Sequence, residues 1–191
     1  MGLGTIVFLV VVLAAVLYGI VIYNALVAIK HAVAQSWANI DVLLKQRNDE
    51  LPKLVAVARE YMGYEQETLE KVIQARTRAE AAQRAGDLPA LGQAENELRI
   101  GLGQIFALAE AYPELRANEV FNQLARRITG LESAIADRRE FYNAAVNRNN
   151  VRIEQFPDVV VARTLGFGPF ELLEFDPSNL RDVDVAALFR P

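Results

Sequence analysis

The side chains that most often carry catalysis are scarce in this sequence. It has one histidine, His31, and no cysteine, so it offers neither a thiolate nucleophile nor a cysteine-ligated metal site. A single histidine also excludes the HExxH zinc motif and the paired Glu-x-x-His motifs of di-iron bundles. Ser36 lies off the three- and four-residue helical steps that would bring it beside His31. We therefore expect no catalytic residues, and we interpret His31 as a polar residue at a membrane edge.

Carboxylates are the remaining candidates for chemistry, and they occur in close sequence groups. Two such side chains could supply oxygen ligands to a divalent cation. Solvent-exposed helix faces produce the same pattern without any ligand, and we favour that interpretation. The sequence thus predicts no metal and no cofactor, and the protein is expected not to be an enzyme. The groups are Glu65/Glu67/Glu70, Glu95/Glu97 and Asp182/Asp184.

Charge is distributed very unevenly along the 191 residues. No Lys, Arg, Asp or Glu occurs from Met1 to Ile29, and every charged side chain lies from Lys30 onward. The formal net charge is −4 and the pI is about 5.2. This mild acidity argues against a nucleic-acid partner, because nucleic-acid-binding proteins usually carry a basic field. The chain therefore joins an uncharged N-terminal block to a charge-rich remainder.

The uncharged block has the length of a membrane-spanning helix. Leu3 to Ile29 exceeds the roughly 20 apolar residues that cross a bilayer core. A cleaved signal peptide is the main alternative, but it needs a preceding basic segment and a shorter apolar run. We predict an uncleaved transmembrane helix over residues 1–29, in contact with lipid from Leu3 to Ile29. The basic residues that follow, beginning with Lys30, favour an outside N-terminus and a cytoplasmic main domain.

The remainder has helical periodicity almost throughout. Pro52 is expected to end the first helix near Asn48–Leu51 and to begin a second, which runs to about Ala85. A third helix is expected over about 89–111, and Asn118 is a plausible cap for a fourth. The predicted fold is all-α: a transmembrane helix continuing into an elongated antiparallel bundle of four long helices over residues 30–157. An irregular tail, 158–191, is expected to be extended and to pack on the bundle or on a neighbouring subunit.

The fourth helix carries a heptad pattern typical of coiled coils. Arg138 and Asn149 interrupt it at positions where an apolar residue is expected. Such polar residues can fix the register or the oligomeric state of a coiled coil. We prefer a simpler interpretation, in which Arg138 pairs with a carboxylate of a neighbouring helix and Asn149 hydrogen-bonds near the bundle end. The apolar positions are Phe121, Leu124, Ile128, Leu131, Ile135, Tyr142, Ala145 and Phe156.

Residues that could contact a partner gather near the end of the first bundle helix. Asp41, Lys45 and Asp49 follow one another at i, i+4 and i+8, a spacing that also suits a local ladder of ion pairs. The neighbouring Trp37 belongs to the buried or partner-facing side. The polar cluster Asn48-Asp49-Glu50 is a reasonable contact site. Further interaction candidates are Arg138 in the heptad pattern and the tail aromatics Phe167, Phe170 and Phe175.

A specific combination of motifs extends along nearly the whole chain. Tyr23-Asn24 ends the apolar run, and it is followed by SWANIDVLLKQRNDELPKLV, by Tyr112-Pro113-Glu114-Leu115, by Arg138-Arg139 and by Phe156-Pro157. With these motifs the sequence resembles the LemA family, single-pass bacterial membrane proteins with a helical-bundle domain. It departs from the usual family pattern at Tyr64, where a histidine is common, and after Phe170.

The resemblance implies a fold and a single-pass topology in a bacterial inner membrane, but little chemistry. Members of the family resemble scaffolds or adaptors, and relatives are linked to membrane metalloproteases of the HtpX type and to magnetosome biogenesis. We hypothesise a membrane-anchored, non-enzymatic scaffold that forms homo-oligomers and contacts another membrane protein, with an HtpX-type protease as one candidate. Two alternatives stay open: a sensory bundle that relays a ligand or stress state across the membrane, and an enzyme or metal carrier.

Overall fold

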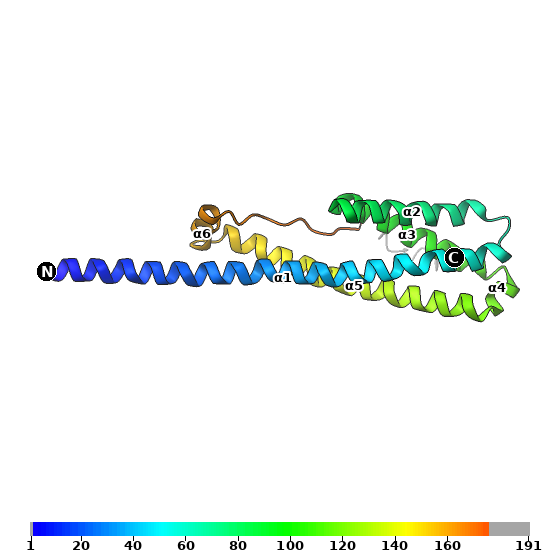
Figure 1. Ribbon diagram of the computed structural model, residues 1–191, viewed down its shortest axis with the longest axis horizontal. Helices are drawn as coiled ribbons and strands as arrows, with labels where there is room; N and C mark the ends of the chain where they lie inside the picture. Colours follow the sequence, from blue (N-terminus) through cyan, green and yellow to red (C-terminus); the bar gives the residue numbers. More distant parts are fainter. Residues whose placement is uncertain (1, 176–191) are drawn as a thin grey trace, which may run out of the picture. The chain divides into compact units, whose positions relative to one another are not determined.

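The computed structural model describes residues 2–175, and it builds this range from helices without a strand (Figure 1). The all-α fold that the sequence predicted is confirmed, with α1, α2, α3 and α5 as its long helices. Residues 176–191 of the expected tail, including Asp182 and Asp184, lie outside the described range. The helices are α1 (Leu3–Tyr61), α2 (Gln66–Ala85), α3 (Leu88–Ala109), α4 (Pro113–Ala117), α5 (Glu119–Glu154) and α6 (Asp158–Leu165).

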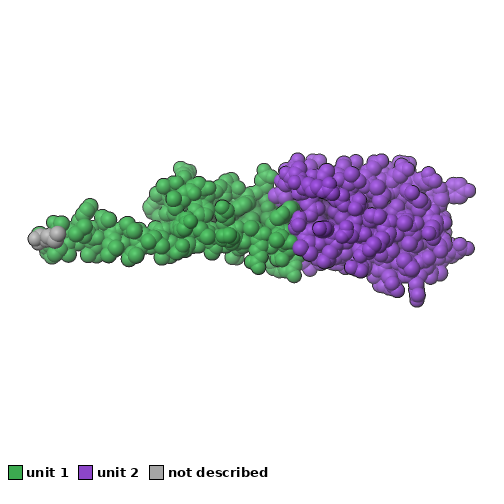
Figure 2. Space-filling model, viewed as in Figure 1, with its two compact units in different colours: residues 1–40, 138–172 green, residues 41–137, 173–191 purple. Residues whose placement is uncertain are grey.

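The chain divides into two compact units (Figure 2). Unit 1 comprises residues 1–40 and 138–172, and unit 2 comprises residues 41–137 and 173–191. One border falls inside α1 and another inside α5, so each of these helices contributes to both units. Neither unit is a single continuous stretch of chain.

The core of unit 2 is made of one apolar stripe from each of its long helices. The stripe positions recur at three- and four-residue steps, which places them on one face of each helix. Each fully buried Leu or Ile contributes about 1.5–3 kcal/mol relative to an exposed one. Buried members include Leu51, Leu54 and Ala58 of α1, Leu69 and Val72 of α2, Leu98, Leu102 and Ile105 of α3, and Phe121 and Ile128 of α5.

The structure corrects the expected helix end at Pro52. Helix α1 continues through this proline to Tyr61, and α2 begins only at Gln66. A proline inside a helix leaves the carbonyl four residues earlier without its N–H donor. Here that carbonyl belongs to Asn48, and Nε of Arg76 on α2 donates to it at 2.8 Å. The side chain of a second helix thus replaces the missing backbone bond, while the buried stripe after Pro52 holds the helix in place.

Helices α2 and α3 form a hairpin with a tight turn. Gly86 ends α2 in the left-handed conformation at φ 70°, and Asp87 caps α3 by accepting a 2.9 Å hydrogen bond from the backbone N–H of Ala90. Gly101 permits the two helices to approach closely, since a Cβ there would lie 2.7 Å from Cγ2 of Val72. The expected break between a helix that ends near Ala85 and one that begins near residue 89 is therefore confirmed, with α3 beginning at Leu88.

Unit 1 contains the N-terminal part of α1, the end of α5 and α6. Ile22 and Leu26 of α1 are buried together with Ile153 of α5 and Ala162 of α6. The ring of Tyr23 meets Phe167 edge-on, with centroids 5.9 Å apart. Side-chain amides of α5 then fasten the segment after α6: Asn149 Nδ2 donates to the carbonyl of Gly168 at 3.1 Å, and Asn150 bonds both backbone groups of Phe170.

The heptad positions of α5 agree only partly with the structure. Ile128, Ile135 and Tyr142 are buried, and Asn118 caps the helix by accepting from the N–H of Phe121 at 3.0 Å. Phe156 is 85% exposed, because α5 ends before it and Ile153 takes the last buried position. Asn149 is buried and hydrogen-bonded as expected.

Two further expectations for this part of the chain are wrong. Arg138 is exposed, and its guanidinium lies 5.8 Å from the ring centre of Phe141 on the same helix; among the described residues it does not form the expected ion pair with a carboxylate of a neighbouring helix. Residues Asp158–Leu165 were expected to be extended, because Val159, Val160 and Val161 are β-branched. They form α6 instead, ended by Gly166 in the left-handed conformation, since burial of Ala162 outweighs a weak local propensity.

The N-terminal part of α1 is long and apolar enough to cross a membrane. Only 6% of its most apolar 18-residue window is buried within the structure, whereas a core helix of a water-soluble protein would be mostly buried. Residues 2–18 are exposed without interruption. An apolar surface of this length needs another apolar medium to cover it, and it fits the transmembrane interpretation of the sequence.

Candidate interaction site

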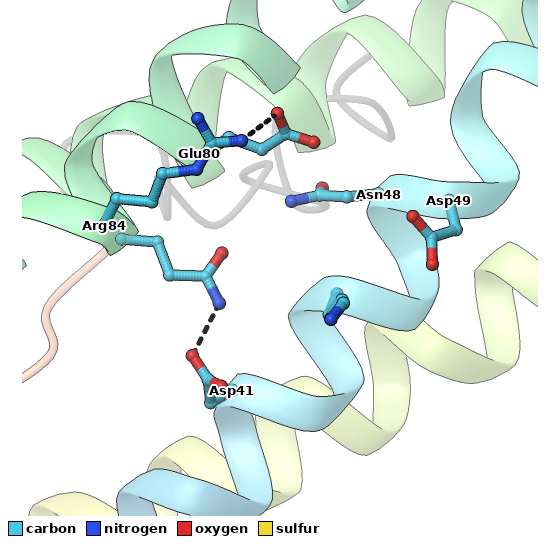
Figure 3. A pocket seen from close by; sticks show the side chains of 7 residues that line it. Asp41, Asn48, Asp49, Glu80 and Arg84 are labelled. Atoms are coloured by element: carbon cyan, nitrogen blue, oxygen red, sulfur yellow. Dashed lines mark hydrogen bonds and ion pairs between the residues drawn. The ribbon is translucent and has the colours of Figure 1, made fainter.

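A polar pocket of about 380 Å³ opens between α1 and α2 in unit 2 (Figure 3). The α1 side supplies Asp41, Lys45, Asn48 and Asp49, all four of which the sequence singled out. The α2 side supplies Glu80, Gln83 and Arg84. Their spacing along each helix explains the gathering, because residues three, four, seven or eight positions apart share one helix face.

Hydrogen bonds fix part of this lining. Gln83 Nε2 donates to Asp41 Oδ1 at 2.7 Å, across the pocket from α2 to α1. Glu80 accepts from Arg76 at 2.7 Å and pairs with Arg84 at 3.4 Å. Lys45, Asp49 and Arg84 are exposed. The pocket therefore has a hydrogen-bonded polar wall and an exposed rim that carries both signs of charge.

A buried ion-pair network lies beside the pocket and positions its α1 side. Arg47 is completely buried and makes a two-pronged contact with Glu95 of α3, with Nη1–Oε2 at 2.5 Å and Nη2–Oε1 at 2.7 Å. Its Nη1 also donates to Glu132 of α5 at 2.9 Å, and Nη2 donates to Oδ1 of the adjacent Asn48 at 3.3 Å. One arginine thus links three helices of unit 2.

Burial and charge act in opposite directions in this network. Burial alone would lower the pKa of Arg47, but the hydrogen bonds and charges of Glu95 and Glu132 raise its pKa overall. Burial raises the pKa of Glu132, and the nearby Arg47 only partly offsets this. Two carboxylates share one guanidinium, and Glu132 is the less deeply buried of the two.

The other sequence-derived candidates do not join the pocket. Glu50 is buried and pairs with Lys53 at 3.1 Å and Arg127 at 3.3 Å. Trp37 is half-buried against Tyr142, with ring centroids 5.6 Å apart. Burial raises the pKa of that tyrosine, and its hydroxyl donates to the carbonyl of Glu171 at 2.9 Å. Arg138, Phe167 and Phe170 have the local contacts described for unit 1, and Phe175 is half-buried.

Sequence reasoning missed the network and the α2 wall of the pocket. The carboxylate group Glu95/Glu97 was interpreted as a solvent-exposed face, but Glu95 is buried. A signal was present, because Arg47 falls between Leu44 and Leu51 on the apolar stripe of its helix. Glu95 likewise falls between Leu91 and Leu98. A charged residue on a buried stripe requires a buried partner of opposite charge.

The pocket presents charges and amides for binding. Its lining contains no Ser, Thr, Cys or His. Within residues 2–175, no three acidic or imidazole side chains lie together in a way that could hold a metal ion. The arrangement suits recognition of a charged partner surface through several weak polar contacts.

These features define a class of protein: an all-α helical bundle with one long apolar N-terminal helix, as in a membrane-associated protein. Within this class the chain belongs to the LemA family, whose family model matches residues 36–186. The family and the apolar helix together support a membrane protein.

Similar characterised proteins carry magnetosome names. The chain is 23% identical to magnetosome proteins MamQ 2 and MamQ 1 of Paramagnetospirillum magneticum, over 88% of this chain and 70% of each relative. It is 21% identical to magnetosome protein MamQ of Magnetospirillum gryphiswaldense over the same shares.

Proposed function

We propose that this protein is a membrane-anchored, non-enzymatic scaffold that self-associates and contacts another membrane protein. The observation that carries the proposal is the pocket formed by Asp41, Lys45, Asn48 and Asp49 with the α2 side chains opposite them. The apolar part of α1 would hold this pocket at one membrane, where proteins of the same bilayer are the nearest partners.

The chemistry of the pocket supports contact rather than turnover. Its carboxylates Asp41 and Glu80 are already engaged by Gln83 and by arginines of α2. The free rim offers a cation at Lys45 and an anion at Asp49. A partner helix or loop that carries one charge of each sign would complement this rim. Exposed ion pairs of this kind determine which partner binds more than how tightly it binds.

Self-association has support in the exposed helix α1 of unit 1. Side chains from Leu3 to Tyr18 are exposed, so this surface is open to lipid or to a second copy. The family resemblance makes a membrane metalloprotease of the HtpX type one candidate partner. The proposal also places the pocket on the cytoplasmic side of the membrane.

Cross-linking in the native membrane tests the scaffold directly. The chain has no cysteine, so Asp49→Cys gives a unique reactive group at the pocket rim, and Gln123→Cys gives an exposed control on α5. A membrane protein cross-linked from position 49 but not from 123, and lost again in a Lys45→Glu background, is the expected result. Protein that runs as a monomer after solubilisation, with no cross-linked partner at either position, would overturn the proposal.

The same pocket favours one alternative, a sensory bundle that binds a small charged ligand. Its volume of about 380 Å³ falls within the usual range for ligand sites. A ligand screen read out by thermal stabilisation separates the two functions. Stabilisation that Lys45→Glu abolishes would favour the sensor, and cross-linking without any stabilising ligand would favour the scaffold.

A further inference from the structure

An unusual apolar surface surrounds α6 in unit 1. Phe156, Val160 and Leu165 are 85%, 57% and 54% exposed. They lie just before or within a short helix that packs on the apolar part of α1 through Ala162. Large apolar side chains gathered at this level of exposure usually mark a surface that another apolar phase covers.

A groove runs between α6 and α1 next to these side chains. It has a volume of about 510 Å³ and is lined by Val16, Gly19, Ile20 and Tyr23 of α1 and by Val160, Val161, Thr164 and Leu165 of α6. The Thr164 hydroxyl donates to the carbonyl of Val160 at 2.7 Å, so its proton is engaged within the helix. Gly19 leaves one wall without a side chain. The lining of the groove is therefore almost entirely apolar, and the groove suits a hydrocarbon chain.

The position of the groove along α1 identifies the medium that reaches it. From Leu3 to Ile22, the first buried residue, α1 measures about 30 Å at 1.5 Å per residue. A bilayer core is also about 30 Å thick. The stretch from Leu3 to Ile22 therefore accounts for one full crossing, and α6 lies beside its last residues, from Val16 onward, at the level where the hydrocarbon gives way to the headgroups. The residues from Ile22 to Ile29 are then covered partly by protein.

We propose that α6, together with Phe156, is a second membrane-contacting element that lies in the headgroup–acyl boundary of the bilayer, with a phospholipid acyl chain in the groove against α1. Short amphipathic helices bury one face in this zone and keep a polar face outside. In α6 the polar groups are compatible with this placement. Asp158 is tied to Arg152 at 3.0 Å, and Arg163 is exposed and able to reach lipid phosphate.

Site-directed spin labelling of the full chain in phosphatidylcholine–phosphatidylglycerol vesicles tests this proposal. Because the chain lacks cysteine, Val160→Cys can be labelled alone, and Val120→Cys on α5 is a matched control with 55% exposure. Val11→Cys reports the bilayer core. Relaxation by oxygen, which concentrates in lipid, is compared with relaxation by a water-soluble nickel chelate.

The expected result is a label at position 160 that oxygen relaxes several-fold more strongly than the chelate does, as at position 11, with the opposite ratio at position 120. Quenching of a fluorophore at position 160 by lipids brominated along the acyl chain should agree. A ratio at 160 equal to that at 120 would overturn the proposal. Protection of 160 from both reagents would also overturn it, because a protein surface would then cover α6. Chelate access at position 11 would overturn the membrane crossing itself.

Discussion

The buried Arg47 offers a quantitative test of how unit 2 is held together. Arg47→Met keeps a long side chain on the apolar stripe but removes the cation that contacts both Glu95 and Glu132. The Glu95 side chain is 3% exposed and that of Glu132 is 24% exposed, so water reaches them poorly. Removing one partner of a buried ion pair costs about 3–5 kcal/mol. For a chain of this length, that corresponds to a fall in Tm of roughly 6–20 °C.

A matched surface pair controls for the loss of any arginine. Arg78 pairs with Glu97 between α2 and α3, but both side chains are more than half exposed. Arg78→Met should therefore cost less than about 1 kcal/mol. Both variants and the parent are melted in the same detergent and followed by far-UV circular dichroism. A Tm for Arg47→Met within about 2 °C of that for Arg78→Met would refute the reasoning.

A third variant separates two causes of the expected loss. In Arg47→Met combined with Glu95→Met and Glu132→Met, no carboxylate is left without a partner. Replacement of a whole buried ionic cluster by apolar residues is often neutral or stabilising. We expect this triple variant to regain most of the Tm lost by Arg47→Met. A triple variant as unstable as the single one would show that unpaired carboxylates are not the cause.

Four further outcomes follow from the same contacts. Arg76→Met should lower the free energy of unfolding by about 1–3 kcal/mol in denaturant unfolding. The loss should be smaller in a Pro52→Ala background, where the carbonyl of Asn48 regains a backbone donor. Equal losses in both backgrounds would contradict the role of Arg76 as the substitute donor. In Gly92→Ala, a Cβ would collide with the carbonyl of Glu174, so hydrogen exchange at residues 173–175 should accelerate, and unchanged protection would argue against the packing. Ile135→Ala should lower stability by about 2–5 kcal/mol, with a loss below half a kcal/mol disproving its burial. Burial raises the pKa of Glu132, so just above the ordinary glutamate pKa of about 4.3 this side chain keeps its proton more often in the folded state than in the unfolded chain. The contribution of Glu132 to stability therefore falls as pH rises there, and Glu132→Gln should flatten that slope in pH-dependent melts.

Local patterns predicted the helices well where local forces decide them. The turn at Gly86-Asp87 and the cap at Asn118 were predictable, because glycine conformation and side-chain capping act within four residues. The helix through Pro52 was not, because the group that permits it, Arg76, is distant in sequence. The end of the heptad pattern failed at Phe156 for a related reason: α5 stops first and Ile153 fills the last position.

The candidate site was half predictable. Helical spacing placed Asp41, Lys45 and Asp49 on one face, and the structure does bring them together. The facing residues of α2 depend on how two helices pack, which one helix's periodicity does not specify. Burial of Arg47 was missed for a different reason. A charged residue is expected to be exposed, and only its position on an apolar stripe indicates otherwise.

The contact of Ile22 and Leu26 with Ile153 and Ala162 has a practical consequence for protein production. Shortening the chain after the apolar run would be one way to seek soluble material. A cut after Ile29 would remove one side of this small core and leave the other side facing water, which favours aggregation. The first helix is therefore an integral part of unit 1, and a soluble version would need polar replacements at Ile153 and Ala162 in addition to the truncation.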